Sequence, residues 1–178
     1  MRISIVVPTK NSGPVLRRAL ESLLIQDVPL EIIIADGGST DESAPILRQF
    51  EPHVTWILSG PDRNHYDAIN QGFEAATGDL FGWLCADDEL PAGALAAAIR
   101  AFEQHPESDV VTGACERVYA DGERAIVNPP SDPWAFITRK NVMEQPATIW
   151  RAELHRRIGP LSEEFGFSAD WEYWCRMR

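Results

Sequence analysis

The feature that most constrains the fold is a regular alternation of short, β-branched apolar runs with amphipathic stretches in the first half of the chain. This pattern is typical of strands and crossover helices in a parallel sheet. We therefore predict an α/β fold with a mainly parallel central sheet flanked by helices. The expected strands cover residues 3–8, 30–35, 54–58 and 80–84, and the expected helices include residues 14–26 and 66–76.

Local signals predict where further elements begin or turn. Ser39 and Glu42 have the spacing of a capping box, which predicts a helix start at that point. An alanine-rich helix is expected after Pro91. A fifth strand then leads into a hairpin that is expected to turn at Asp121-Gly122.

Composition limits the number of domains and the kind of ligand. The chain has 178 residues, 44% of them hydrophobic, which is enough for one sizeable core and too little for two ordinary domains. Its net charge of -11 repels polyphosphate backbones and argues against nucleic-acid binding. A phosphate-bearing ligand would therefore need a cation to mediate its binding.

The sequence predicts neither a membrane-spanning segment nor a secretory signal, and its cysteines predict free thiols. No window approaches the roughly 20 apolar residues that span a bilayer, and the N-terminal apolar run is too short for a secretory signal. We expect no transmembrane segment and a cytoplasmic protein, with peripheral binding at the inner membrane face left open. Cys85, Cys115 and Cys175 are far apart and odd in number, which predicts reduced, mostly buried thiols.

Polar and flexible residues gather where the expected strands end. Thr9-Lys10 follows the first strand, residues 36–38 follow the second, and residues 85–88 follow the fourth. Ligands of open α/β sheets bind at the carboxyl ends of the strands. These three segments therefore predict the ligand site.

Asp36 can be interpreted in two ways. Its carboxylate could accept hydrogen bonds from a planar N–H donor, and Gly37 and Gly38 would let a ligand approach the backbone. The same residues are ordinary choices for a turn that leads into a helix. Both interpretations stay open on this stretch alone.

The adjacent acids Asp87 and Asp88 also have two interpretations. Either acid could cap the helix expected after Pro91, where the dipole and free amides favour a carboxylate. One acid is enough for a cap, however. Two carboxylates at a strand end are the ligands with which Mg²⁺ or Mn²⁺ is commonly held beside substrate phosphates.

Asp170 lies in the first turn of a helix expected to begin near Ser168. It could simply compensate the helix dipole. Partial burial among aromatic side chains would instead make the carboxylate more basic, as a general base requires. The neighbouring aromatic residues are Phe165, Phe167, Trp171 and Trp174.

The loop and helix start at residues 60–72 carry further polar residues. Arg63 and His65 could meet phosphate or sugar, or could lie in a solvated loop. Asp67 could serve only the helix dipole.

Four stretches together resemble family 2 glycosyltransferases of the GT-A fold. They are SIVVPTKN, EIIIADGGSTDES, DRNHYDAINQGFEAATGDLFGWLCADDEL and FGFSADWEYWCRM, in the order of the family and over nearly the entire chain. The resemblance implies a single GT-A, Rossmann-like domain over residues 1–178. Residues 1–115 would form the nucleotide-sugar-binding half and residues 116–178 an acceptor and base half that is truncated or short.

The resemblance also implies an activity. The reaction would be an inverting transfer of a sugar from a UDP-, GDP- or dTDP-sugar to a hydroxyl of a saccharide or lipid-linked acceptor. It would serve polysaccharide or glycoconjugate synthesis, with Mn²⁺ or Mg²⁺ on the diphosphate.

The resemblance extends to individual residues. Asp87 matches the metal-coordinating last acid of the DxD motif, Asp88 stands beside it as a second metal ligand, and Asp170 matches the catalytic base. Asp36 is the implied partner of a base N–H. The positions that match nucleotide-sugar-binding residues are Pro8, Thr9, Asp36, Arg63, Asp67, Asn70, Ala86 and Asp87.

The chain departs from the family pattern at two positions. Cys85 stands where many relatives have the first acid of the DxD motif, so a ribose or metal contact from that side chain is not expected. Gly37 stands where many relatives have a second acid, which leaves Asp36 as the one carboxylate expected at the base.

Two alternative functions remain. One is a non-catalytic domain that binds nucleotide sugars or acts as a scaffold, which is consistent with Cys85 and with the end of the chain just after the base motif. The other is a nucleotidyltransferase that makes sugar nucleotides. The stretch after the first strand lacks the glycine-rich, basic phosphate loop that this second chemistry would favour.

Overall fold

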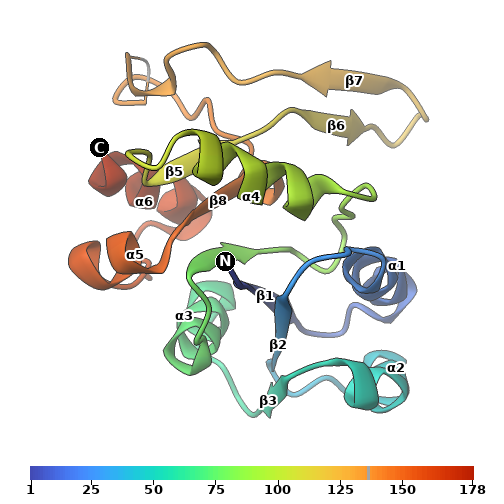
Figure 1. Ribbon diagram of the computed structural model, residues 1–178. Coiled ribbons are helices and arrows are strands. Elements are labelled where there is room, and N and C mark those ends of the chain that lie inside the picture. The colour runs from blue at the N-terminus through green and yellow to red at the C-terminus, as the bar shows by residue number, and fades with distance from the viewer. Residues whose placement is uncertain (136) are drawn as a thin grey trace.

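The computed structural model describes residues 1–135 and 137–178 of the chain (Figure 1). Its α-helices are α1 (Gly13–Leu24), α2 (Ser43–Phe50), α3 (His65–Ala75), α4 (Ala94–Gln104), α5 (Ala152–Ile158) and α6 (Ala169–Met177). Its strands are β1 (Ile3–Thr9), β2 (Leu30–Asp36), β3 (Trp56–Ser59), β4 (Leu80–Trp83), β5 (Val110–Thr112), β6 (Cys115–Val118), β7 (Arg124–Val127) and β8 (Thr148–Arg151). Short 3₁₀ turns lie at Glu51–His53, Pro133–Ala135, Gln145–Ala147 and Gly166–Ser168.

The central sheet has the strand order β3-β2-β1-β4-β8-β5. Strands β1 to β4 are parallel, whereas β8 lies antiparallel between β4 and β5. The fold is therefore α/β with a mainly parallel central sheet, as predicted. The parallel strands and the helices α1 and α3 also lie within one or two residues of the expected bounds.

The two faces of the sheet pack against different sets of helices. On one face, side chains of β1 such as Ile5 join apolar residues of α1, α2 and α4. On the other face, Val6 joins residues of α3, α5 and α6 in a cluster rich in aromatic rings. Figure 1 shows α1 and α2 on one side of β1–β3 and α3 on the other. The alternation along β1 thus gives each face its own core.

Helix α3 approaches β1 closely because Gly72 has no side chain. A Cβ at Gly72 would lie 2.8 Å from Cγ2 of Val6, closer than real carbon contacts. The close approach packs the later part of α3 against the middle of β1.

Two predicted caps are wrong. Helix α2 begins at Ser43, and Ser39 instead donates from its hydroxyl to Asp36 and accepts from the backbone N–H of Asn11. Glu42 occupies the N-cap position without a side-chain bond. The segment therefore forms a longer turn than a capping box allows, because Ser39 already has other partners.

Neither Asp87 nor Asp88 provides the expected cap at the start of α4, a part of the chain that the structure describes. That helix begins at Ala94, and its N-cap is Gly93, whose φ of +80° is in the left-handed region. The backbone N–H of Asp88 instead donates to the carbonyl of Cys85 and closes a turn. The acids therefore belong to the strand end and not to the helix.

The second half of the chain differs more from expectation. Strand β8 and helix α5 were not predicted, because an apolar run as short as Thr148–Arg151 has no periodicity of its own and is fixed by burial between β4 and β5. The hairpin β6–β7 does turn at Asp121-Gly122, with Gly122 at φ +87°. It lies apart from the central sheet in Figure 1.

All three cysteines are free, as expected, but they are less buried than expected. Cys85 and Cys115 are half-buried and Cys175 is exposed. Among the residues that the structure describes, no helix combines the length and the apolar character needed to span a bilayer.

Candidate active site

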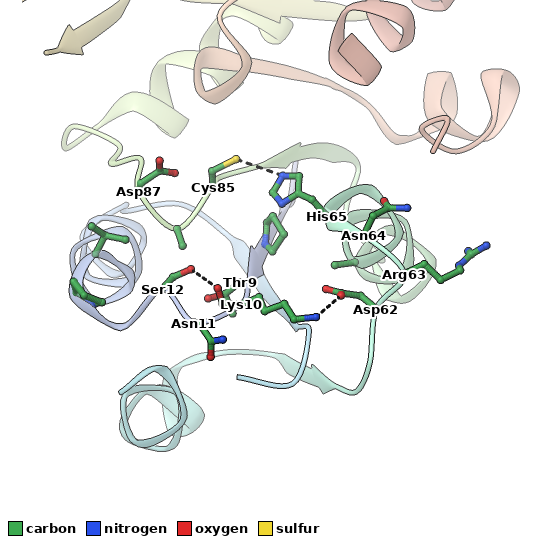
Figure 2. Close-up of a pocket in the computed structure, with 15 residues that line it drawn as sticks. Thr9, Lys10, Asn11, Ser12, Asp62, Arg63, Asn64, His65, Cys85 and Asp87 are labelled. Carbon is green, nitrogen blue, oxygen red and sulfur yellow. Dashed lines mark hydrogen bonds and ion pairs between the residues drawn. The ribbon is translucent and has the colours of Figure 1, made fainter. Parts of the chain in front are cut away.

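A cavity of about 660 Å³ opens at the carboxyl ends of β1 and β4, beside the start of α3 (Figure 2). It lies at the edge of the sheet where the strand-end segments were predicted to form a ligand site. Its lining residues are Pro8, Thr9, Lys10, Asn11, Ser12, Pro14, Val15, Asp62, Arg63, Asn64, His65, Ala68, Cys85, Ala86 and Asp87.

The N-terminal ends of α1 and α3 both meet this cavity. Ser12 and Pro14 come from the start of α1, and Asn64 and His65 from the start of α3. Helix N-termini carry partial positive charge and favour anions. The ammonium of Lys10 adds a full positive charge, so the cavity combines cationic groups with the acids of the β4 end.

Five of the eight residues predicted to bind the nucleotide sugar line the cavity. Thr9 is of particular interest because its side chain is buried, yet its Oγ1 has no hydrogen-bond partner among the described residues. Buried hydroxyls normally have a partner, so Thr9 is a candidate for a ligand contact. The five residues are Pro8, Thr9, Arg63, Ala86 and Asp87.

Asp36 lies outside the lining of the cavity. Its Oδ1 accepts hydrogen bonds from the backbone N–H and hydroxyl of Ser39, at 3.0 Å and 2.6 Å. Its Oδ2 accepts a long one from the Ser59 hydroxyl, at 3.4 Å. The carboxylate therefore holds the loop after β2, and its contact with a base stays a prediction.

Asp67 and Asn70 also lie outside the lining and have protein partners. Asp67 is buried and accepts from the backbone and guanidinium of Arg63, and the guanidinium bond is the main reason that the pKa of Asp67 is lowered. The amide of Asn70 donates to the carbonyl of Leu161 and accepts from its N–H, each at 2.9 Å. Both residues connect parts of the protein, and their donor contacts stay predictions.

The acids after β4 form a compact cluster with Cys85. One ligand atom each of Cys85, Asp87 and Asp88 lies within 4.8 Å of the other two. Burial, followed by the charges of Asp87 and Glu144, raises the pKa of Asp88 to about 6. Carboxylates this close repel each other, so a divalent cation would relieve the repulsion, and their oxygens are the donors that Mg²⁺ or Mn²⁺ prefers.

Cys85 faces the same cluster but differs chemically from the acids. Burial, followed by Asp88 and Asp87, raises the pKa of its thiol to about 12, so the sulfur is protonated at neutral pH. The thiol lies 3.8 Å from Nε2 of His65 (Figure 2). It also donates to Oε1 of Gln145 at 3.6 Å. A protonated thiol is a poor ligand for a hard cation, which leaves the two carboxylates as the fitting donors.

Asp170 is half-buried in the first turn of α6, and burial raises the pKa of its carboxyl. Its Oδ2 accepts from the side-chain amide of Asn141 at 2.9 Å, and its Oδ1 accepts from the backbone N–H of Trp171. The expected surroundings were partly wrong, because Phe165 and Phe167 are exposed to solvent.

Asp170 does not line the cavity but lies on the same side of the sheet. After burial, its charge is the next cause that raises the pKa of Tyr66, in the first turn of α3. It also contributes to the raised pKa of Cys85. The candidate base therefore lies near the first turn of α3 and near Cys85.

Two lining residues, Asp62 and Asn64, were not predicted from the sequence. Asp62 forms an ion pair of 3.0 Å with Lys10, which belongs to a predicted strand-end segment (Figure 2). Asn64 caps α3 with its side chain. Asp36 is the last residue of β2, and Asp62 lies in the loop just after β3. The position of Asp62 after a parallel strand was therefore the signal that could have identified it.

A comparison with known proteins assigns the chain to a family. Residues 4–151 match the family model described as Glycosyl transferase family 2. A PGL/p-HBAD biosynthesis glycosyltransferase of Mycobacterium bovis is 32% identical over 182 aligned residues, which cover 96% of this chain and 67% of the relative. An uncharacterised glycosyltransferase of Mycobacterium tuberculosis is 30% identical, over 98% of this chain and 68% of the relative. The chain belongs to glycosyltransferase family 2.

Solved structures share the fold. TarS 1-349 of S. aureus in complex with UDP-GlcNAc has a TM-score of 0.81 at 21% identity, over 99% of this chain and 53% of that chain. A mannosyltransferase from Pyrobaculum calidifontis in complex with GDP-Man and Mn²⁺ has a TM-score of 0.76 at 22% identity, over 99% and 51%. These likenesses confirm the GT-A fold. The chain spans about half the length of these structures.

Proposed function

We propose that the protein is an inverting glycosyltransferase that moves a sugar from a nucleotide-diphosphate sugar to an acceptor hydroxyl. The observation that carries this proposal is the cavity at the carboxyl edge of the sheet, which joins Thr9 and Lys10 to the acidic cluster around Asp87 in a family 2 chain. Such a cavity has room for a nucleotide. Its cationic wall and helix N-termini suit a diphosphate.

Binding of the donor would use both ends of the cavity. Pro8, Thr9 and Ala86 would contact the nucleoside, and Arg63 would stabilise negative charge. Asp36, Asp67 and Asn70 complete the set predicted to bind the donor; their side chains already have protein partners, so they would act mainly by fixing the loops that surround the donor.

Asp87 and Asp88 would hold the divalent cation, Mn²⁺ or Mg²⁺, which when bound would supply positive charge to the diphosphate. The residues fit this ion because two carboxylates lie within reach of one centre. The solved mannosyltransferase with Mn²⁺ supports the choice of ion by analogy of fold.

Asp170 would act as the general base. Its carboxylate would take the proton of the acceptor hydroxyl as that oxygen forms a bond to the anomeric carbon. The bond from this carbon to the diphosphate oxygen breaks on the opposite face, and its electron pair leaves with the diphosphate. A single displacement inverts the configuration, and the raised pKa of Asp170 suits proton removal near neutral pH.

The whole chain would act as one catalytic domain. Residues 1–115 would bind the donor, and residues 116–178 would supply the base and the acceptor side. The insertion of β8 between β4 and β5 supports this assignment, because it places a strand from the second half within the sheet of the first. The acceptor would be a saccharide or a lipid-linked glycan, met in the cytoplasm or at the inner membrane face.

A thermal-shift screen tests the proposal. UDP, GDP, dTDP and their sugars would each be added with and without Mn²⁺, and binding raises the melting temperature according to the affinity of the ligand. We expect at least one nucleotide sugar to stabilise the protein more with Mn²⁺ than without. Glu89→Ala, which removes an exposed acid beyond the cluster, is the matched control and should behave as wild type. No shift with any nucleotide would contradict the proposal.

A non-catalytic domain that binds nucleotide sugars is the second candidate. The observation that favours it is Cys85, a protonated thiol in the acidic cluster. This candidate predicts the same thermal shifts but no release of nucleotide from the donor. Measuring free UDP or GDP over time with each stabilising donor separates the two functions.

A further inference from the structure

Gly37 leaves a space at the end of β2 that a carboxylate from another loop fills. A Cβ at position 37 would lie 2.7 Å from Cγ of Asp62 and would overlap Oδ2 of the same side chain. Asp62 comes from the loop between β3 and α3, and its side chain is only 10% exposed. A side chain at position 37 and the present position of Asp62 therefore exclude each other.

Asp62 differs from Asp36 in its access to the cavity. Asp62 lines the cavity, whereas Asp36 does not, and both oxygens of Asp36 accept hydrogen bonds from serine side chains or backbone. Oδ1 of Asp62 accepts a hydrogen bond from Nζ of Lys10. Among the residues that the structure describes, none donates a hydrogen bond to Oδ2. The carboxylate with a free oxygen at the cavity is thus Asp62.

We propose that Asp62, in the space that Gly37 leaves open, accepts the N–H of the nucleotide base, with Lys10 donating to the carbonyl beside it. This inference rests on the proposed function and names the kind of base that the donor carries. A free acceptor oxygen next to an ammonium donor matches an N–H next to a carbonyl. That arrangement is the imide edge of uracil or thymine.

Guanine also presents an N–H beside a carbonyl, so the occupied Oδ1 is the feature that disfavours it. Guanine presents two adjacent N–H groups, which a carboxylate binds best with both oxygens free. Here the ion pair with Lys10 holds one oxygen, so the exocyclic amine of guanine would lack an acceptor from Asp62. The site therefore favours UDP or dTDP over GDP.

Isothermal titration calorimetry at fixed Mn²⁺ tests the inference with four ligands: UDP, dTDP, GDP and UDP methylated at N3 of uracil. We expect the wild-type chain to bind UDP and dTDP more tightly than GDP. Methylation replaces the base N–H, so it should weaken binding about 10- to 100-fold, the range of a hydrogen bond to a charged group. Asp62→Ala should weaken UDP binding by a similar factor and should not distinguish UDP from its methylated form.

A swap of the two positions is the sharpest variant. Asp62→Ala combined with Gly37→Asp moves the carboxylate to the other loop, since position 37 does not need a left-handed backbone. The double variant should regain both affinity for UDP and sensitivity to methylation. Glu103→Ala, which removes one negative charge from the exposed face of α4, is the control and should bind as wild type.

Each failure has a separate meaning. If wild type binds UDP but Asp62→Ala remains sensitive to methylation, or if Asp36→Ala loses that sensitivity instead, the role of Asp62 is overturned and the proposed function stands. Tighter binding of GDP than of UDP would overturn the inference in the same way. If wild type binds no nucleotide at all, the proposed function itself fails, and the inference fails with it.

Discussion

The candidate site has two parts: the donor side, which lines the cavity, and the base side, which carries the proposed general base Asp170. The two parts are built in different ways. On the donor side, the ends of adjacent parallel strands place Thr9 and Asp87 at one edge of the sheet through regular backbone pairing. On the base side, Asp170 is positioned through long-range side-chain bonds, such as that from Asn141. One half of the site therefore follows from local sequence rules, whereas the other depends on contacts between distant segments.

The largest effect should come from replacing Asp170, the proposed general base. Asp170→Asn keeps the shape of the side chain but removes its ability to take a proton, so transfer should fall by roughly 10²- to 10⁴-fold. Affinity for the donor, measured by calorimetry, should stay at the wild-type value because Asp170 lies outside the cavity. Glu172→Gln, in the same helical turn, is the matched control. Normal transfer by Asp170→Asn would show that another residue is the base.

The next effect should come from the donor side. Asp87→Ala removes a ligand of the proposed cation, and because even residues that only orient metal ligands cost 10- to 100-fold, affinity for Mn²⁺ should fall by at least about 100-fold. The part of the thermal shift that depends on Mn²⁺ should disappear, while the shift with nucleotide alone should remain. Stabilisation by the donor that never needed a metal would count against this role of Asp87.

Loss of the hydrogen bonds between Asn70 and Leu161, which connect the two sides, should have an intermediate effect. The amide of Asn70 makes two hydrogen bonds to the backbone of Leu161, so Asn70→Ala leaves two buried backbone groups without partners. We expect the free energy of unfolding to fall by about 1–3 kcal/mol in urea denaturation. Glu74→Ala, on the exposed face of the same helix, should change it little. A loss of donor affinity in folded Asn70→Ala would instead support the direct donor contact predicted from the sequence.

The smallest effect should be a change in pH dependence. Asn141 donates to Asp170 and lowers its pKa, opposing the larger rise from burial. Asp170 must be deprotonated to act, so transfer is lost as the pH falls through its pKa. Asn141→Ala should raise that pKa and move the acidic limb of the pH–rate profile to higher pH, with little change on the alkaline side. Unchanged limbs would show that Asn141 does not position the base.

The sequence predicted the donor side better than the base side for a physical reason. The apolar run before Thr9 and the glycine-rich turn after Asp36 carry their structural meaning within a few residues. Strand β8 has no such signal, since it becomes a strand only by pairing with β4 and β5. Its place in the sheet therefore could not be predicted from its own residues.

Two further misses show where local rules mislead. Asp88 was a reasonable helix cap by composition, but the chain uses Gly93 in a left-handed conformation to begin α4. Asp62 was overlooked although it follows a parallel strand, because the space that it occupies lies beside Gly37, on another loop. Both cases depend on how segments meet in space, which a single sequence does not encode locally.

The central claim is a single displacement at a nucleotide-diphosphate sugar, and the stereochemistry of sugar release tests it most directly. Proton NMR would follow the wild-type protein with Mn²⁺ and an α-linked donor that stabilises it, with water or a simple alcohol as acceptor. The account predicts that the first sugar product is the β anomer, before mutarotation mixes the two forms. A first product in the α configuration would contradict it.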